Sequence, residues 1–386
     1  MRTESGRLWR KAEGLRKLAL KRLTASDLTF FEWHFRNHNA GNQKAINLNA
    51  DVFVSQLYPS LPEIAMASNG RLPIDLYLYG PGFAQELNLQ RKVIKIGSYK
   101  NWRLDGEFIY DPPVDTDRFH ILTPGDIVVF EFGGDVMPLS LKAFFVSQSL
   151  NEDRLIQGIL SDYLGSRPMA TVAPVELESL IRQAGLSDRH TVNELLIESD
   201  LEDAAQRGEV GLEKLYSRRS GARLSKAELA KAIKRLEEVG QLGEEFVQAY
   251  LEGLKVRGQV VDYRWVSQEN AVSPFDFSFE DQSSRGLLDV KATTGLFERT
   301  LHISVPELQA MLNENLYVIY RVYEMSDNSA KLRISGATKE FAATVLEVLQ
   351  KLPAGIRSDG ISLDPSRLAF GPEILLLLEA DATQSA

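Results

Sequence analysis

The sequence predicts a multidomain protein in which an N-terminal β-barrel is followed by a helical linker and a C-terminal α/β domain. The 386 residues exceed the usual size of a single domain. Short apolar segments separated by Gly, Pro and Asn turns run from about residue 22 to residue 148, which favours a β-barrel. Amphipathic helices come next, and helical and extended patterns alternate from residue 242 onward. We therefore expect domains at 1–155, 156–237 and 238–386.

The composition excludes several classes of protein. The absence of cysteine rules out disulfides, thiolate zinc sites and cysteine nucleophiles, and it fits a reducing compartment. No window approaches the roughly eighteen uninterrupted apolar residues of a membrane span, and the N-terminus lacks the apolar core of a secretory signal. Hydrophobic residues at 44% and charged residues at 25% are ordinary for a soluble globular protein. We expect a cytoplasmic protein without a membrane partner.

Positive charge is clustered, although the chain is acidic overall. A net charge of -9 and a pI near 5.3 argue against a general nucleic-acid coat. They do not exclude a DNA enzyme, because DNA binding depends on the local charge of the binding face. Basic clusters occupy the first 22 residues and residues 218–235. Residues 87–104 contain no acid and five cations, Arg91, Lys92, Lys95, Lys100 and Arg103.

The first 22 residues are predicted to form a basic helix, either solvated or in contact with phosphates. Apolar residues recur there at roughly helical spacing, at Leu8, Leu15, Leu18 and Ala19. The barrel strands are predicted at 74–79, 92–96, 127–132 and 141–146, and the last two are expected to be central. Turn sequences at 122–126 and 132–135 flank the third of these strands.

Two loops of the predicted barrel, at 36–49 and 96–106, are more polar than their position requires. Both contain Arg, Lys, Asn or Gln, whose side chains donate to base edges, and the second adds Tyr and Trp. Such turns also occur without a ligand, but two of them in one barrel favour a DNA-reading surface. The candidate DNA-contacting residues are Asn42, Gln43, Lys44, Lys95, Tyr99, Lys100, Asn101, Trp102 and Arg103.

The barrel region resembles the N-terminal effector domain of EcoRII-type restriction endonucleases, a DNA-binding pseudobarrel of the plant B-three type. The stretches that carry the resemblance are 22–27, 41–44, 57–60, 91–106 and 122–131. The resemblance implies a B-three-like fold for the first domain. It also implies that 36–49 and 95–103 are the two arms that grip the major groove.

The middle of the chain is predicted to be helical. An amphipathic helix follows Pro174 and ends at Gly185, and a second short helix is expected from Thr191. These two helices fit a plain bundle better than a DNA-binding helix-turn-helix, because bundles are far commoner. A strong helix is predicted at 224–239, where Ser225 and Glu228 form a capping box.

The last domain begins with a helix at 242–254 that carries Glu244 beside its apolar stripe. Strands are predicted at 260–266, 275–279, 287–293 and 316–323. Between the last two strands, His302 precedes a helix whose Ser304 and Glu307 form a capping box. This order predicts a mixed α/β layer.

Three acids and a lysine in this domain form a candidate catalytic site. Asp289 and Lys291 project to the same face of a strand, because side chains repeat every second residue. Asp276 follows an apolar segment on the preceding strand, where a buried charge needs a partner or a metal. With Glu244 on the helix, the order is that of the PD-(D/E)XK nuclease core. The competing interpretation is that these residues are surface charges at strand ends.

Residues 242–325 resemble the nuclease-like domain at the C-terminus of the plant protein NO VEIN. The shared positions are Gly243, Glu244, Val247, Leu251, Trp265, Asn270, Phe275, Asp276, 289–293, Ile303, Ser304, Glu307 and 320–322. Where that family more often has Glu, this chain has Asp289 before Lys291. The spacing favours Glu244 over Glu245 as the residue that faces the site.

These features predict a sequence-specific, Mg²⁺-dependent endonuclease of restriction type that cuts double-stranded DNA. Asp276, Asp289 and the Val290 carbonyl are expected to bind the metal. Lys291 would assist the attacking water and Glu244 would support the metal or its water. A catalytic role for His302 is the weaker alternative. Cutting both strands needs two sites, so we expect a homodimer on DNA.

Two other functions fit the sequence. One is a nuclease specific for methylated DNA, in which Trp102, Tyr99 or Phe83 stacks on a flipped base. The other is a DNA-binding regulator or subunit of a defence system whose nuclease fold is inactive. No phosphate-binding Gly-x-x-x-x-Gly-Lys-Ser/Thr loop occurs, so we expect no nucleotide cofactor.

Overall fold

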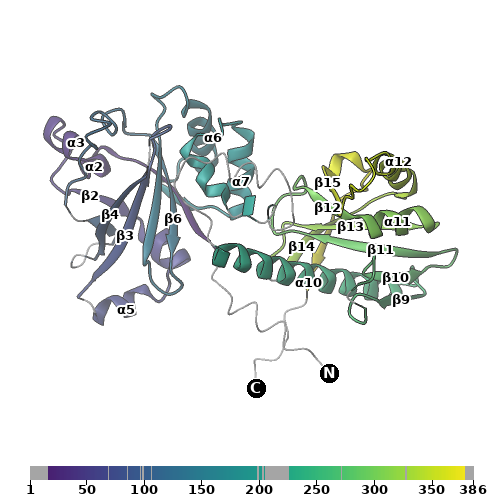
Figure 1. The fold of residues 1–386 in the computed structure, drawn as a ribbon. Coiled ribbons are helices and arrows are strands. Elements are labelled where there is room, and N and C mark those ends of the chain that lie inside the picture. Colours follow the sequence, from purple (N-terminus) through teal and green to yellow (C-terminus); the bar gives the residue numbers. More distant parts are fainter. Residues whose placement is uncertain are drawn as a thin grey trace, which may run out of the picture. The chain divides into compact units, whose positions relative to one another are not determined.

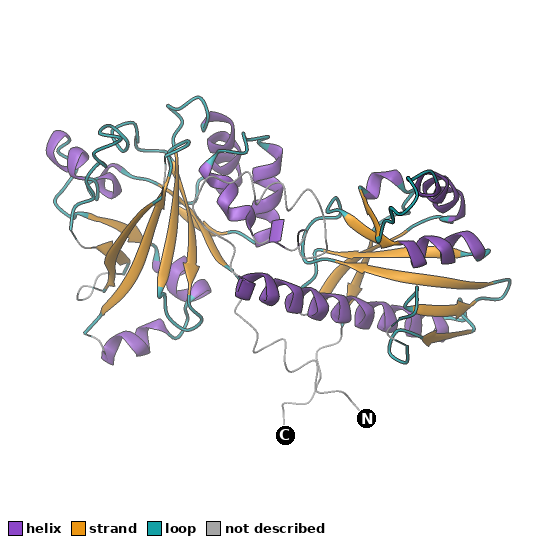
Figure 2. Ribbon diagram, in the orientation of Figure 1, coloured by secondary structure: helices purple, strands orange, loops and turns teal. Residues whose placement is uncertain are grey.

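The computed structural model describes residues 16–67, 69–84, 86–95, 97, 100–105, 107–197, 200, 201, 204, 226–270, 272–326 and 328–378. Its chain divides into two compact units, and the described residues of the first run up to Leu196. Figure 1 traces both units, and Figure 2 distinguishes their helices from their strands. The first unit is a curled β-sheet with helices, and the second is a mixed α/β layer. The multidomain α and β organisation is therefore confirmed.

An eight-stranded sheet forms the first unit. Its strand order is β2-β5-β4-β3-β7-β6-β1-β8, in which β3 and β7 are parallel and the other neighbours are antiparallel. The sheet curls into a half-barrel with β2 and β8 at its two ends, so it is more open than the predicted barrel. The strands are β1 (Lys17–Arg22), β2 (Ala45–Leu48), β3 (Arg71–Tyr79), β4 (Leu87–Ile94), β5 (Trp102–Asp105), β6 (Ile127–Gly133), β7 (Ser140–Val146) and β8 (Met169–Thr171).

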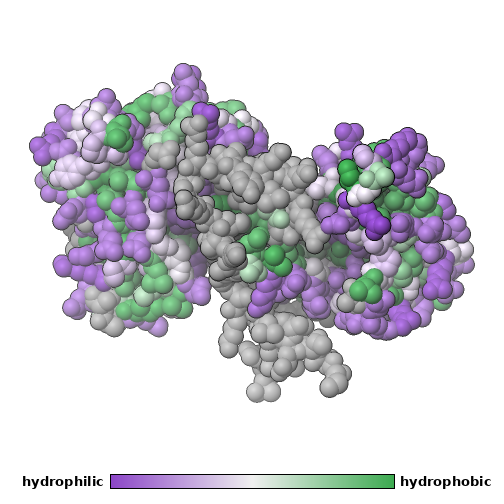
Figure 3. Space-filling model, viewed as in Figure 1, coloured by the Kyte–Doolittle hydropathy of each residue, from purple (hydrophilic) through white to green (hydrophobic). Residues whose placement is uncertain are grey.

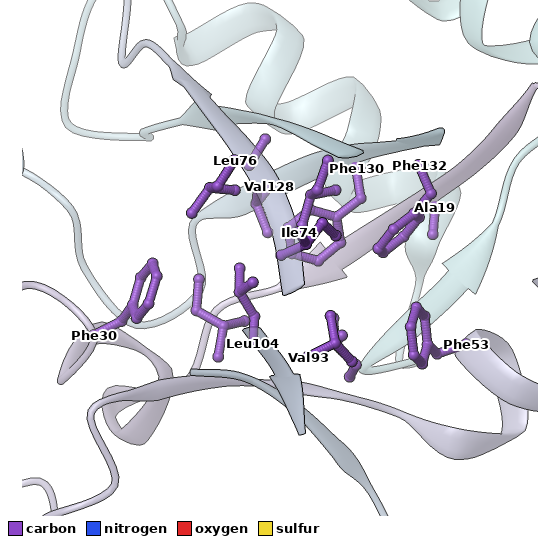
Figure 4. Packing of buried hydrophobic residues seen from close by; sticks show 14 of the residues in the cluster. Ala19, Phe30, Phe53, Ile74, Leu76, Val93, Leu104, Val128, Phe130 and Phe132 are labelled. Atoms are coloured by element: carbon purple, nitrogen blue, oxygen red, sulfur yellow. The ribbon is translucent and has the colours of Figure 1, made fainter. Parts of the chain in front are cut away.

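The middle of this sheet is buried on both faces. Val128 and Phe130 of β6 pack into the core inside the curl, which Figure 4 shows from close by. Ile127 and Val129 of the same strand pack into a second core on the opposite face. Alternate side chains of a strand point to opposite faces, so an unbroken apolar run marks a strand that is covered on both sides. The predicted central strands at 127–132 and 141–146 are confirmed.

The prediction of a basic helix over the first 22 residues is wrong in its described part. β1 is a strand that pairs with β6 on one side and β8 on the other. Leu18 and Leu20 face one core and Ala19 faces the other, so their spacing has a period of two. Residues 1–15 lie outside the described residues.

Helices cover both faces of the eight-stranded sheet. They are α2 (Ala25–Leu28), α3 (Glu32–Asn37), α4 (Ala50–Val52), η2 (Phe53–Leu57), α5 (Leu61–Ala67), α6 (Arg154–Leu164), α7 (Pro174–Gln183) and η3 (Thr191–Leu196). The last three bury Ile156, Leu177 and Leu195 in the second core. A separate helical linker was expected at 156–237. Its residues up to 196 instead belong to the first unit, because their apolar side chains pack into the second core.

The second unit contains a six-stranded sheet in the order β16-β14-β13-β11-β10-β9 and a two-stranded sheet of β12 and β15. β11 and β13 run parallel, and the other neighbours are antiparallel. The strands are β9 (Asp262–Trp265), β10 (Phe277–Glu280), β11 (Arg285–Ala292), β12 (Leu301–Ser304), β13 (Tyr317–Tyr323), β14 (Ser329–Ile334), β15 (Gly360–Leu363) and β16 (Ile374–Leu377). Hydrophilic residues cover much of the visible face of this unit (Figure 3).

Helices lie on both faces of the six-stranded sheet (Figure 1). They are α10 (Lys226–Val256), α11 (Val305–Asn313), α12 (Lys339–Gln350) and the short η4 (Pro365–Arg367). The predicted helices at 224–239 and 242–254 are one continuous helix, α10. The proposed Ser225 cap lies outside the described residues. None of the helices in the described ranges is long and apolar enough to cross a membrane.

Asp27 connects three elements of the first unit. Its Oδ2 lies 3.1 Å from the Lys21 Nζ and accepts hydrogen bonds from the Thr24 backbone and hydroxyl. Its Oδ1 accepts from the Asn47 amide at 2.8 Å. Asp27 and Lys21 are both buried. One carboxylate thus joins β1, α2 and β2.

We predict that Asp27→Ala destabilises the first unit by about 3–5 kcal/mol, because it leaves the Lys21 charge buried without its partner. Urea denaturation followed by tryptophan fluorescence measures the change. Asp51→Ala, which removes an exposed carboxylate of α4, is the control. Equal stability of the two variants would contradict the assignment.

Candidate active site

The strand β11 and the approach to β10 bring three predicted site residues together. The Asp276 amide donates to the Leu288 carbonyl at 3.0 Å, which extends the β10–β11 pairing by one residue. Asp276 Oδ2 in turn accepts from the Val290 amide at 2.7 Å. Asp276 is therefore fixed beside Asp289 through the backbone of the strand that carries Asp289 and Lys291.

Lys291 lies between two carboxylates. Its Nζ is 2.8 Å from Asp289 Oδ2 and 2.9 Å from Glu307 Oε1. The side chains of Asp289, Lys291 and Glu307 are 6%, 17% and 16% exposed. The same-face prediction for Asp289 and Lys291 is confirmed. Glu307 was expected to be a helix cap, and the structure adds its contact with the lysine.

Glu244 lies on α10, and its charge acts on Asp276. Its Oε2 accepts hydrogen bonds from the Trp265 indole at 2.6 Å and from the Ser267 hydroxyl. The neighbouring Glu245 instead accepts from the Gln241 amide at 3.3 Å. Of the two glutamates, Glu244 is the one whose charge is a cause of the raised pKa of Asp276. Trp265 and Ser267 are the residues that orient it, and sequence reasoning had assigned them no role.

Close packing of α10 against β11 sets the position of Glu244. A Cβ placed on Gly243 would lie 2.4 Å from the Ala292 Cβ and 3.6 Å from the Val290 Cγ1. The helix therefore approaches the strand as closely as glycine allows. Val290 and Ala292 face the helix, and Asp289 and Lys291 point to the opposite face.

Burial and mutual repulsion raise the pKa values of the three acids. Burial, and then the Glu244 charge, raises the pKa of Asp276 to about 6. Burial also raises the pKa of Asp289, against the attraction of Lys291. The pKa of Glu244 is raised by burial as well, although the Ser267 and Trp265 hydrogen bonds oppose the shift. The ammonium of Lys291 is stabilised by Asp289 and Glu307, which raise its pKa.

The donor set fits a small divalent cation such as Mg²⁺. Asp289 Oδ2 is buried, and the Lys291 ammonium lies 2.8 Å from it. Oxygen ligands from carboxylates and carbonyls suit Mg²⁺, and a cation would relieve the repulsion that raises the pKa of Asp276. In the described part of the chain, no three His, Asp or Glu side chains form a ready metal cluster.

His302 lies outside the six-stranded sheet. It is on β12, opposite Ser362 of β15, in the two-stranded sheet. Its Nε2 would lie 2.9 Å from a Cβ placed on Gly360, so the β15 backbone packs against its ring. This position favours a structural role for His302 over a role as general base for the site on β11.

The prediction that Trp102 contacts DNA is wrong. Trp102 is 2% exposed and packs edge-on against Phe53 in the core of the first unit, because alternate residues of β5 point inward. It is equally unable to stack on a flipped base. Phe83 is 44% exposed, and its ring contacts the His190 ring edge-on. Tyr99 lies outside the described residues.

The other predicted DNA-contacting residues differ in whether their side chains contact other parts of the protein. Gln43 donates to the Ser26 and Ala45 carbonyls. Lys44 lies over the rings of Phe35 and Phe108, 4.4 Å from the centroid of Phe108.

Asn101 Oδ1 accepts from the Ala50 amide, and Lys95 Nζ donates to the Lys100 carbonyl. Asn42 and the Lys100 side chain are exposed, and Arg103 is half-buried on β5. These contacts hold the side chains of Gln43, Lys44, Lys95 and Asn101, and Asn42 and Lys100 stay in contact with solvent.

A groove of about 780 Å³ lies along β3, β4 and β5 of the first unit. Arg71 and Lys92 are exposed on its wall, and Arg71 pairs with Ile94 just before the β4–β5 turn. The Lys95 amide donates to the Gly70 carbonyl, which extends the β3–β4 pairing by one residue beyond Arg71 and Ile94. Acidic side chains of Asp75, Asp105 and Glu107 also line it. Arg71 is isolated in the sequence, and the strand pairing alone brings it to this surface.

Comparison with known proteins gives a match to part of the second unit. The family model described as Protein NO VEIN, C-terminal, matches residues 243–335. The match includes Glu244, Asp276, Asp289, Lys291 and Glu307, and it spans less than half of the chain. A search of curated proteins found no match.

We predict that Asp276→Asn stabilises the metal-free protein at neutral pH. The pKa of Asp276 is raised in the folded state, so the folded state binds more protons. The resulting loss of stability grows as pH rises from about 4 to about 6 and is then constant. Asn retains an acceptor for the Val290 amide. We expect an advantage of about 1–3 kcal/mol at pH 8 that exceeds the advantage at pH 5 by about 1 kcal/mol.

Urea denaturation in EDTA at both pH values measures this advantage. Asp281→Asn is the control, because the amides and hydroxyls of Ser283 and Ser284 lower the pKa of Asp281. Its titration is complete below pH 5, so its difference from wild type should be equal at the two pH values. A pH-independent effect of Asp276→Asn would refute the raised pKa of Asp276 in the folded protein.

Proposed function

We propose that the chain is a Mg²⁺-dependent endonuclease of restriction type that cuts double-stranded DNA in the cytoplasm. The observation that carries the proposal is Lys291, held within 2.9 Å of the buried Asp289 carboxylate and the half-buried Glu307 carboxylate, beside Asp276. A lysine among convergent acids is the arrangement that metal-assisted hydrolysis of a phosphodiester requires. The match to the NO VEIN C-terminal model, whose family resembles nuclease domains, supports a PD-(D/E)XK-type core.

Each residue has a distinct role in this proposal. Asp276, Asp289 and the Val290 carbonyl would hold Mg²⁺, which supplies charge stabilisation to the scissile phosphate. Lys291 orients the attacking water through its ammonium and stabilises negative charge as the phosphorus–oxygen bond breaks. Glu244, fixed by Trp265 and Ser267, orients water from the α10 side.

The first unit would recognise the DNA sequence. The curled sheet, the polar loops at 36–49 and 95–103 and the exposed cations Arg71 and Lys92 of the groove support a B-three-like, EcoRII-type effector domain. Exposed Asn42 and Lys100 are suited to base edges, and Arg71 and Lys92 to phosphates. A homodimer on DNA would supply the two sites that a double-strand cut needs.

We predict that Lys291→Ala and Asp289→Asn each reduce cleavage of plasmid DNA in Mg²⁺ by at least about 100-fold, with DNA binding retained. Glu245→Gln, which alters the neighbouring glutamate on α10, should cut like wild type. Equal cutting by wild type and Lys291→Ala would refute the site. Cutting of methylated plasmid alone would indicate a modification-dependent nuclease, and binding without cutting would indicate an inactive regulator.

We predict that Arg71→Ala and Lys92→Ala weaken DNA binding similarly for all sequences. Each loses one phosphate contact, so the slope of log affinity against log salt falls by about 1 per variant. Titration by fluorescence anisotropy between low and moderate salt measures the slope. Arg154→Ala removes an exposed arginine of α6 and is the control. An unchanged slope in both groove variants would place the DNA elsewhere.

A further inference from the structure

We infer that Glu307 is a positioning residue that holds the Lys291 ammonium against Asp289 in the catalytic geometry. The inference rests on the proposed nuclease function. It assigns Glu307 a task besides capping α11. Glu307 would touch neither DNA nor metal, and it would act through the lysine.

The two oxygens of Glu307 have separate partners. Oε2 accepts from the Ser304 amide at 2.7 Å, which is the capping bond at the start of α11. Oε1 lies 2.9 Å from Lys291 Nζ. The Ser304 hydroxyl completes the cap by accepting from the Glu307 amide at 3.3 Å. The cap fixes the carboxylate at the helix end, so the second oxygen is presented to the lysine at a set place.

A cap alone does not explain this contact. A capping box needs one oxygen on the side chain at the third position, and Gln serves there as well as Glu. A lysine side chain has four rotatable bonds, and one carboxylate contact restrains it weakly. The second carboxylate, on a different element, restricts the ammonium to the space between β11 and α11. Fixed placement of this kind increases the fraction of productive complexes.

Glu307→Gln separates the two tasks. The Gln oxygen can retain the bond from the Ser304 amide, and its NH₂ group then faces Lys291, which has donors alone. The cap survives and the lysine contact is lost. Ser304→Ala does the reverse. It removes the hydroxyl half of the cap and leaves the Ser304 amide to hold Glu307.

The experiment compares wild type, Glu307→Gln and Ser304→Ala in full-length protein. For Glu307→Gln we expect a thermal midpoint near that of wild type, kcat for plasmid cleavage lower by roughly 10- to 100-fold and an unchanged KM. For Ser304→Ala we expect a lower thermal midpoint and wild-type kcat below that midpoint. A wild-type kcat in Glu307→Gln would overturn the inference. So would a kcat that falls in both variants in step with stability.

A second readout does not depend on cleavage. Acetylation of Lys291 by an N-hydroxysuccinimide ester, followed by mass spectrometry, reports how firmly the ammonium is held. We expect faster acetylation in Glu307→Gln and the wild-type rate in Ser304→Ala. If no variant cuts DNA but this difference appears, the positioning contact stands and the nuclease function fails. Equal acetylation rates in all three proteins would refute the contact itself.

Discussion

The second unit depends on keeping one lysine and several acids buried together. Each charge in the cluster costs free energy when it leaves water, and removing one partner leaves the others uncompensated. Lys291 meets this constraint with Asp289 from its own strand and Glu307 from α11. Parallel pairing of β11 with β13 places the strand in the middle of the sheet, and α11 begins directly after β12. The elements that bury the site are therefore also those that position its charges.

Much of this arrangement follows from short-range rules in the sequence. The two-residue period of a strand predicted that Asp289 and Lys291 share a face, and an apolar context predicted that Asp276 lies close to them. The contact between Glu307 and Lys291 was not predictable, because the capping box already explained Glu307 and the lysine is 16 residues away. The choice of Glu244 over Glu245 depends on how far α10 is rotated, which Gly243 determines through its contact with Ala292.

The first unit shows where the same rules were insufficient. Leu18 and Ala19 fitted a helical spacing in a basic segment, yet β1 needs them on opposite faces because both faces of its sheet are covered. Trp102 was assigned to a DNA-reading loop by residue type, but it begins β5 and points into the core. The groove wall at Arg71 and Lys92 arises from antiparallel pairing of strands. Loop composition alone could not identify residues that neighbouring strands bring together.

Electrostatic repulsion at the candidate site connects stability with chemistry. Burial and the Glu244 charge raise the pKa of Asp276 to about 6, so its ionised form costs the metal-free protein stability at neutral pH. Its position is maintained by uncharged contacts, namely the Val290 amide, the Leu288 carbonyl and the close approach of α10 to β11. A framework that forces acids together in this way costs folding free energy. It also favours cation binding, because a bound cation removes the repulsion between the acids and this relief adds to the binding free energy. The same framework explains why the lysine has two anchors. If Asp289 turned toward a metal, Glu307 would still hold the ammonium beside it.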